Sequence, residues 1–151
     1  MPDESAVFQR IDKTIEPFTS YRKALEDLRA LPPGYAMCFA SQYVHADICN
    51  GGVSQLYGNS TWPLILDAVA AAEHANVHQV AHLLKEIVYY YHKKDRSKLK
   101  RKIDDSYFID MPNDWDKSLA QLDDEFFSLD SELEQVVPAL CNEHEELFAD
   151  S

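Results

Sequence analysis

The fold is organised by one stretch, Ile48-Cys49-Asn50-Gly51-Gly52-Val53-Ser54-Gln55-Leu56-Tyr57-Gly58-Asn59-Ser60. It contains three of the four glycines in the chain, and the apolar spacing on both sides of it is typical of helices. Glycines concentrated in this way mark backbone that turns sharply or is approached closely. We expect Asn50 or Gly51 to take the left-handed conformation that ends one helix, and Gly52 to let the next helix start almost at once.

The polar side chains of this stretch admit two interpretations. Asparagine, glutamine and tyrosine are good donors and acceptors, so they can line a pocket. They can also cap helix ends and satisfy buried backbone groups around a tight corner. We favour the second interpretation, in which the structural signature of the corner consists of Asn50, Gly51, Gly52, Gln55, Tyr57 and Asn59.

Apolar residues recur at three- and four-residue steps along most of the chain, and no stretch shows the convincing two-residue alternation of a strand. The spacing predicts helices at about 7–15, 20–31, 35–49, 61–72, 77–91, 115–129 and 133–147. Because the linkers between them are short, we expect a compact all-α bundle of about seven helices that forms one domain over residues 1–151.

Individual residues predict where these helices begin and end. Thr19 or Ser20 can cap the second helix, and residues 59–61 offer caps for the fourth, which tolerates Pro63 in its first turn. Asn76 marks a break before the helix with the strongest amphipathic pattern. Near the end of the chain, Ser131 is a candidate N-cap and Pro138 is expected to kink the last helix.

Composition indicates an ordinary globular chain. A length of 151 residues with 46% hydrophobic content is enough for a single core. No apolar run approaches the roughly 20 residues that cross a bilayer, and the N-terminus lacks a signal pattern, so we expect a cytoplasmic protein without a membrane partner. Cys38, Cys49 and Cys141 are odd in number, sit in apolar surroundings and show no Cys-x-x-Cys spacing, which predicts reduced core thiols.

Charge is distributed unevenly along the chain. Residues 1–103 hold 13 Lys and Arg against 11 Asp and Glu, a net of +2, whereas residues 104–151 hold Lys117 against 15 acids, a net of −14, and the two sum to −12. A basic segment, residues 93–104, lies directly before the acidic third. Its Lys and Arg cluster contains no aromatic side chain to stack on a base, and the overall sign repels a polyanion, so we expect a solvated loop and no direct nucleic-acid binding.

Two motifs resemble the signature of the DNA-mimic protein family, a group of small acidic helical domains most of which have no assigned activity. They are NGGVSQLYGNS at 50–60, followed by an alanine-rich helix, and LDDEFF at 122–127. The resemblance covers about residues 35–148. It departs from the family pattern at Val53, where an aromatic residue is usual, and at 61–63, where a glycine is usual. The resemblance implies an acidic all-helical domain that imitates DNA.

The acidic residues of the last third predict a binding face. Asp116, Asp123 and Asp130 are seven residues apart beside an apolar stripe, and the acids of the last helix follow a similar edge. Seven helical residues rise by about 10 Å, and phosphates follow one another about every 3.4 Å along a DNA strand, so two staggered helices can approach the charge density of a duplex edge. The expected face comprises Asp116, Asp123, Asp124, Asp130, Glu132, Glu143, Glu146 and Asp150.

This face and the resemblance together suggest a non-catalytic protein that occupies the DNA-binding surface of a transcription factor or other basic DNA-binding protein, as a monomer or homodimer and without a cofactor. An immunity-type or antitoxin-type inhibitor has the same composition and differs only in its target. An ordinary solvated surface is the third interpretation, because acidic helical faces are most often just that.

A metal site is the alternative from another class. His74, His78 and His82 step by four, with Glu86 continuing the row, and such spacing can place two imidazoles on one ion. Because Asn76 interrupts the first step, the remaining candidates are His78 and His82, with Glu73, Glu86 or Asp47 to complete the site. Histidines on a polar helix face are more often solvated than ligating.

Enzyme motifs are missing from the sequence. It contains no His-Glu-x-x-His, no phosphate-binding loop, no dinucleotide fingerprint and no Gly-x-Ser-x-Gly. Asp123 and Asp124 are adjacent, and neighbours in a helix point about 100° apart, so they do not face each other as an acid–base pair. An enzyme would need a site assembled from residues far apart in the sequence, and we therefore expect no catalysis.

Overall fold

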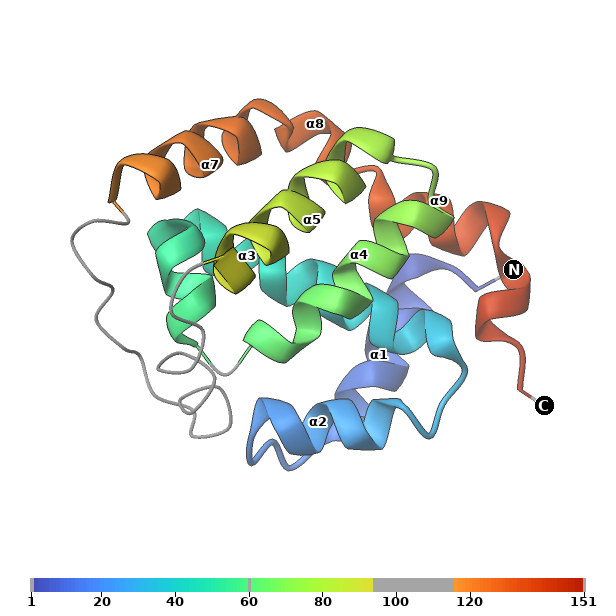
Figure 1. Ribbon diagram of the computed structural model, residues 1–151. Coiled ribbons are helices and arrows are strands. Elements are labelled where there is room, and N and C mark those ends of the chain that lie inside the picture. Colours follow the sequence, from blue (N-terminus) through green and yellow to red (C-terminus); the bar gives the residue numbers. More distant parts are fainter. Residues whose placement is uncertain (1, 60, 94–115, 151) are drawn as a thin grey trace.

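Helix α3 (Pro33–Gly58) runs through the middle of the molecule, and the other helices pack around it (Figure 1). The computed structural model of the chain describes residues 2–59, 61–93 and 116–150. Buried residues lie on every side of α3, among them Cys38, Phe39, Ala40 and Ile48. Residues 34–40 are buried without interruption, as expected of a helix inside a protein, and α3 is therefore the axis of the core.

The remaining elements cover α3 and contain no strand in the described residues. They are α1 (Glu4–Ile15), α2 (Tyr21–Leu28), the 3₁₀ turn η1 (Trp62–Leu64), α4 (Ile65–His74), α5 (His78–Lys93), α7 (Asp116–Ser128), α8 (Asp130–Leu133), α9 (Val136–Glu143) and the 3₁₀ turn η3 (Glu145–Phe148). The predicted all-α bundle is confirmed. The basic segment 93–104 lies outside the described residues, apart from Lys93 at the end of α5.

Helix boundaries confirm some of the predicted signals. The Ser20 hydroxyl accepts a hydrogen bond from the Lys23 backbone N–H at 3.1 Å, so Ser20 is the N-cap of α2. Asn76 has φ 59° between α4 and α5, the left-handed conformation that ends a helix. The cap expected at 59–61 is wrong for Thr61, because its hydroxyl donates to the buried carboxylate of Asp47 and no side chain caps η1.

The glycine corner bends α3 at a different residue from the one expected. Gly52 has φ 78° and ψ −176°, whereas Asn50 and Gly51 remain in the helical run. The expectation of a left-handed Asn50 or Gly51 is therefore wrong. This conformation is restricted almost entirely to glycine, and a Cβ on residue 52 would also lie 2.7 Å from Asp123 Oδ2.

Asp123 of α7 holds this bend from outside the helix. Its Oδ1 accepts a hydrogen bond from the Val53 backbone N–H at 2.7 Å, at the point where α3 restarts after Gly52. Burial raises the pKa of the Asp123 carboxyl, and the hydrogen bond from Val53 opposes that rise. Asp123 is half-buried and acts as a cap supplied by another helix, so this member of the predicted acidic face also has a role in the fold.

The end of the chain is divided more finely than the two predicted helices. Leu129 and residues 134–135 separate α7, α8 and α9, and His144 separates α9 from η3. Ser131 lies inside α8 and is not a cap, since Leu129 occupies that position. Pro138 is the third residue of α9, in the first turn, where its missing N–H leaves no hydrogen bond unmade.

Aromatic packing joins the second half of α3 to η1 and α5. The ring centroids of Tyr57 and Trp62 are 5.0 Å apart, and those of Trp62 and Tyr91 are 4.5 Å apart. The Tyr57 hydroxyl donates to the Ile87 carbonyl at 2.6 Å, which satisfies a buried polar group. The bend at Gly52 thus directs the last turns of α3 into the core.

Two of the three cysteines lie in the core. Cys38 and Cys141 are buried free thiols, as expected, but Cys49 is exposed on α3, so the prediction of a core thiol is wrong there. Across the described ranges, no helix is both long and apolar enough to cross a membrane.

The bend predicts the effect of Gly52→Ala. Because alanine is strained at this φ and its Cβ would collide with the Asp123 carboxylate, we expect the free energy of unfolding to fall by at least about 2 kcal/mol. Urea denaturation followed by circular dichroism measures it. The double variant Gly52→Ala/Asp123→Ala removes the collision and keeps the strain, so it separates the two causes. If Gly52→Ala alone had the native free energy of unfolding, the backbone at residue 52 could change its conformation at no cost, which would contradict this prediction.

The cap predicts a difference between two neighbouring aspartates. Asp123→Ala removes the acceptor for Val53 N–H and should lower the free energy of unfolding by about 1–2 kcal/mol. Asp124→Ala is the matched control, because Asp124 is exposed on the same helix, and its effect should stay within about 0.5 kcal/mol. Equal losses in the two variants, measured by urea denaturation, would contradict the cap.

Candidate functional site

Carboxylates are concentrated on α7, α8, α9 and η3, which follow one another around the upper and right-hand edge of the bundle in Figure 1. Residues 119–150 contain ten Asp and Glu and no Lys or Arg. The expected rows along two helix edges are wrong in detail, because Leu129 (φ −101°, ψ 20°) and His144 (φ −131°, ψ 54°) leave the helical conformation between the acids. The acids are instead distributed over successive short helices.

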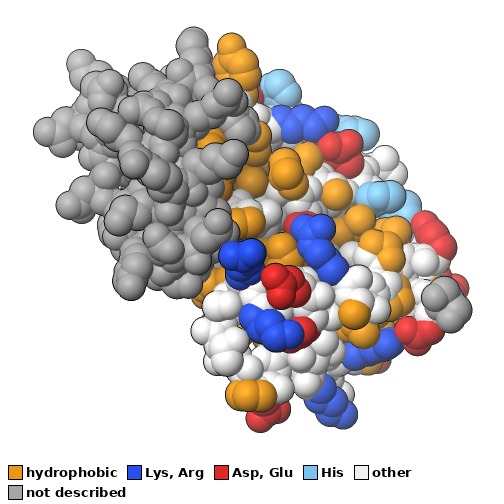
Figure 2. All heavy atoms as spheres, turned by 60° about the horizontal axis from the view of Figure 1, so that its bottom comes forward, with side chains coloured by type: hydrophobic (Ala, Val, Ile, Leu, Met, Phe, Trp, Pro, Cys, Tyr) orange, Lys and Arg blue, Asp and Glu red, His pale blue; other side chains and the backbone are white. Residues whose placement is uncertain are grey.

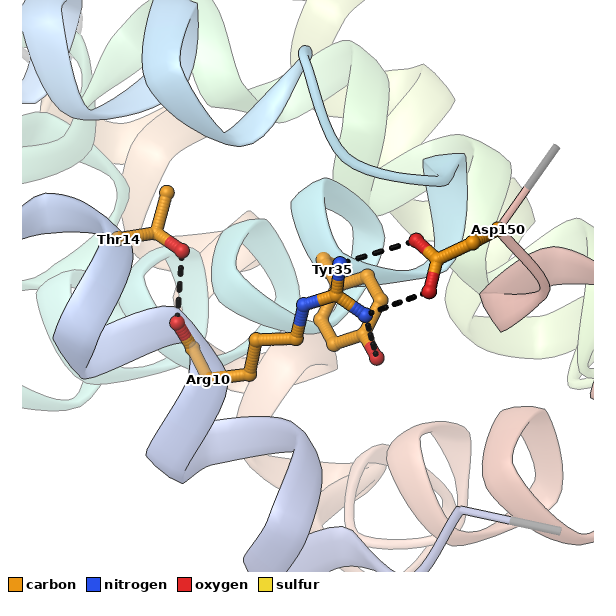
Figure 3. A network of polar contacts seen from close by, with 4 residues as sticks. All are labelled: Arg10, Thr14, Tyr35 and Asp150. Atoms are coloured by element: carbon orange, nitrogen blue, oxygen red, sulfur yellow. Dashed lines mark hydrogen bonds and ion pairs between the residues drawn. The ribbon is translucent and has the colours of Figure 1, made fainter.

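One of the predicted face residues, Asp150, is held by an ion pair (Figure 3). Arg10 of α1 donates to both carboxylate oxygens of Asp150, with N–O distances of 2.9 and 3.3 Å. The same guanidinium donates to the Tyr35 hydroxyl at 3.2 Å and lies 4.9 Å from the centre of the Tyr35 ring. The hydrogen bond from Arg10 keeps the pKa of Asp150 below its usual range. Asp150 is therefore a compensated charge that ties the C-terminal segment to α1 and α3.

Histidines lie beside two other predicted face residues. Asp130 Oδ1 is 3.8 Å from Nε2 of His45 on α3. Glu146 Oε1 is 3.0 Å from Nδ1 of His144. Hydrogen bonds from its own backbone N–H and from His144 lower the pKa of Glu146. These carboxylates keep their exposure, but each has a partner that becomes cationic on protonation.

Four exposed or half-buried carboxylates have no ion pair and no side-chain hydrogen bond with any described residue: Asp124, Glu132, Glu134 and Glu143. Glu132 and Glu143 line a groove of about 470 Å³ between the α4–α5 turn and the helices α8 and α9. Asp116 begins α7, and its side chain lies outside the described residues. The structure thus brings together Glu132 and Glu143, and places Asp123 and Asp150 in other roles.

The opposite part of the molecule has balanced charges. Figure 2 shows a face on which Lys and Arg lie next to Asp and Glu. The ion pairs in and next to α2 have this character: Arg22–Glu26, Lys23–Asp27 and Arg29–Asp67. Paired surface charges of this kind contribute little net field, so the negative charge of the described part is concentrated on α7 to η3.

The glycine corner closes around one buried carboxylate. Asp47, on α3, accepts hydrogen bonds from Asn59 at 3.1 Å and Gln55 at 3.5 Å, in addition to Thr61. Asn50 and Gly51 are exposed. Gln55 and Asn59 therefore satisfy a side chain and not the buried backbone groups that the sequence suggested, and they fix the connection from α3 to η1.

The histidine row does not assemble a metal site in the described part of the chain, where no group of three ligating side chains is positioned for an ion. His74 lies in α4 with its ring 5.9 Å from that of His144, whereas His78 is exposed at the start of α5. His82 pairs with Glu86 at 3.1 Å, and Glu73 pairs with Lys85 at 3.2 Å.

Several partners of the acids are not identifiable from the sequence. Arg10 and Asp150 are 140 residues apart, and His45 meets Asp130 only because α3 and α8 pack near each other. Gln79 and Gln135 line the groove with the two glutamates, and nothing in the sequence around either glutamine predicts that position. The Glu146 pair is the exception, since His144 precedes it by two residues.

Comparison with known proteins identifies a family. The model of the DMP19-like protein family matches residues 29–146, which include α3, the glycine corner and the acidic helices up to the start of η3. No curated protein and no solved structure matches the chain. The family match spans most of the described bundle, and the chain therefore belongs to the DMP19-like protein family.

Proposed function

We propose that this chain is a non-catalytic acidic protein that occupies the DNA-binding surface of a basic DNA-binding protein, such as a transcription factor. The observation that carries the proposal is that residues 119–150 contain ten acids and no Lys or Arg, while four of those acids have no ion pair or side-chain hydrogen bond in the described part. A surface of this kind attracts Lys and Arg side chains that otherwise contact phosphates.

The arrangement of the acids supports a protein partner that normally wraps or follows a curved polyanion. The helices α7, α8, α9 and η3, which carry the acids, turn around the edge of the bundle (Figure 1). Contacts with the phosphate charges supply a large share of the affinity of a DNA-binding protein for DNA, and carboxylates can imitate these charges. Competition with DNA distinguishes this partner from the target of an immunity-type inhibitor.

The proposal predicts capture of a DNA-binding protein that duplex DNA displaces. The immobilised chain is incubated with cell lysate at low salt, and retained proteins are identified by mass spectrometry. We expect a basic DNA-binding protein whose retention falls at least about tenfold between 50 and 300 mM salt, since screening weakens the attraction. Adding a duplex that contains its binding site should release it.

Charge variants provide the control for this capture. Asp124→Asn/Glu132→Gln/Glu143→Gln removes three charges from the acidic helices and should lower retention at least about tenfold. Glu4→Gln/Asp12→Asn/Glu16→Gln removes three charges at or beside α1 and should change it less than about twofold. Retained proteins that do not bind DNA, or that ignore added duplex, would contradict the proposal.

A further inference from the structure

The groove beside the α4–α5 turn is a built polar surface. Its volume is about 470 Å³, within the range of ligand-binding pockets. Such pockets are mostly apolar, whereas most residues that line this groove are polar. Asn76, His78 and Gln79 line it from the turn and the start of α5, and Glu132, Gln135 and Glu143 line it from the side of α8 and α9. Only small or half-buried apolar residues contribute, among them Val77, so the wall favours a polar occupant.

The charge of the groove is uncompensated among the described residues. Glu132 is half-buried and Glu143 is exposed, and neither makes an ion pair or a side-chain hydrogen bond there. Two other acids near α9 have partners, since Glu146 contacts His144 and Asp150 contacts Arg10, and Glu134 is without one but does not line the groove. Among the acids without such a partner, Glu132 and Glu143 are the two that line the groove, where their charge is available to an incoming cation.

The donor set selects the kind of cation. In the described part of the chain no three ligating side chains are grouped for a metal ion, so a compact metal site does not form here. Two carboxylate residues, Glu132 and Glu143, line the groove together with Asn76, Gln79 and Gln135, whose side-chain amides each carry an oxygen that can accept a hydrogen bond. A guanidinium carries five N–H donors in a plane, which matches acceptors on two walls better than the compact ammonium of lysine does.

We propose that this groove binds an arginine side chain from a basic segment of the partner protein. The inference rests on the proposed function, which supplies a basic partner, and adds the place and the residue type. The carboxylates of Glu132 and Glu143 pair with the guanidinium, and the amides accept its remaining N–H groups. The groove is open to solvent, since Gln79, Gln135 and Glu143 in its wall are exposed.

The test uses peptides of defined composition with the full chain. Calorimetric titration with a hexa-arginine peptide at 50 mM salt should show binding, and hexa-lysine should bind at least about threefold more weakly. Glu132→Gln/Glu143→Gln should weaken hexa-arginine binding at least about tenfold. Asp124→Asn/Glu134→Gln is the matched control, with the same charge removed outside the groove, and should weaken it less than about threefold.

Nuclear magnetic resonance maps the contact directly. Amide signals of residues 76–79 and 132–143 should shift most on titration with hexa-arginine, and those of residues 120–125 least. Equal weakening by the two double variants, equal affinity for the two peptides, or shifts spread over the whole acidic surface would each overturn the groove proposal. None of these results would contradict the acidic-surface function, which fails only if the captured partners do not bind DNA.

Discussion

The contact between Asp123 and the bend in α3 is the constraint on which the arrangement of the molecule depends. A helix that bends sharply leaves backbone N–H groups without carbonyl partners, and the Asp123 carboxylate supplies an acceptor for Val53 from another helix. The bend turns Leu56 and Tyr57 into the core, where Tyr57 reaches α5. The same contact fixes α7 against α3. The half-buried Asp123 therefore helps to position the helix that also carries exposed acids.

Local signals predicted the amphipathic helices well and the central helix less well. The stripes of α1, α2 and α5 separate apolar from polar faces, and Ser20 and Asn76 mark boundaries through their own side chains or backbone. In helix α3 the restart after the glycine corner was expected, but the helical run was expected to end at Asn50 or Gly51 and in fact continues to Gly52. Which glycine bends it is decided by Asp123, 70 residues away from Val53 in the sequence.

The acidic site shows the same limit of sequence reasoning. Composition located the acidic third, and the motifs pointed to the family that the comparison shows. Neither could separate an acid used by the fold from one left exposed, because the decisive partners, such as Arg10 for Asp150 and Val53 for Asp123, come from distant segments. The break expected near Asp130 is found at Leu129, but the short helix α8 and the break at His144 were missed, since short helices are set by packing and carry weak local signals.

The acids of the last third therefore divide into two groups with different consequences. Asp123 and Asp150 connect separate elements, so replacing either removes a contact as well as a charge. Glu132 and Glu143 make no side-chain hydrogen bond or ion pair within the described residues, and like charges on one surface repel and lower stability. A cationic partner relieves that repulsion, and binding to the folded chain alone stabilises it by mass action. Binding and folding are thus coupled through charge, while the side chains responsible for each remain distinct.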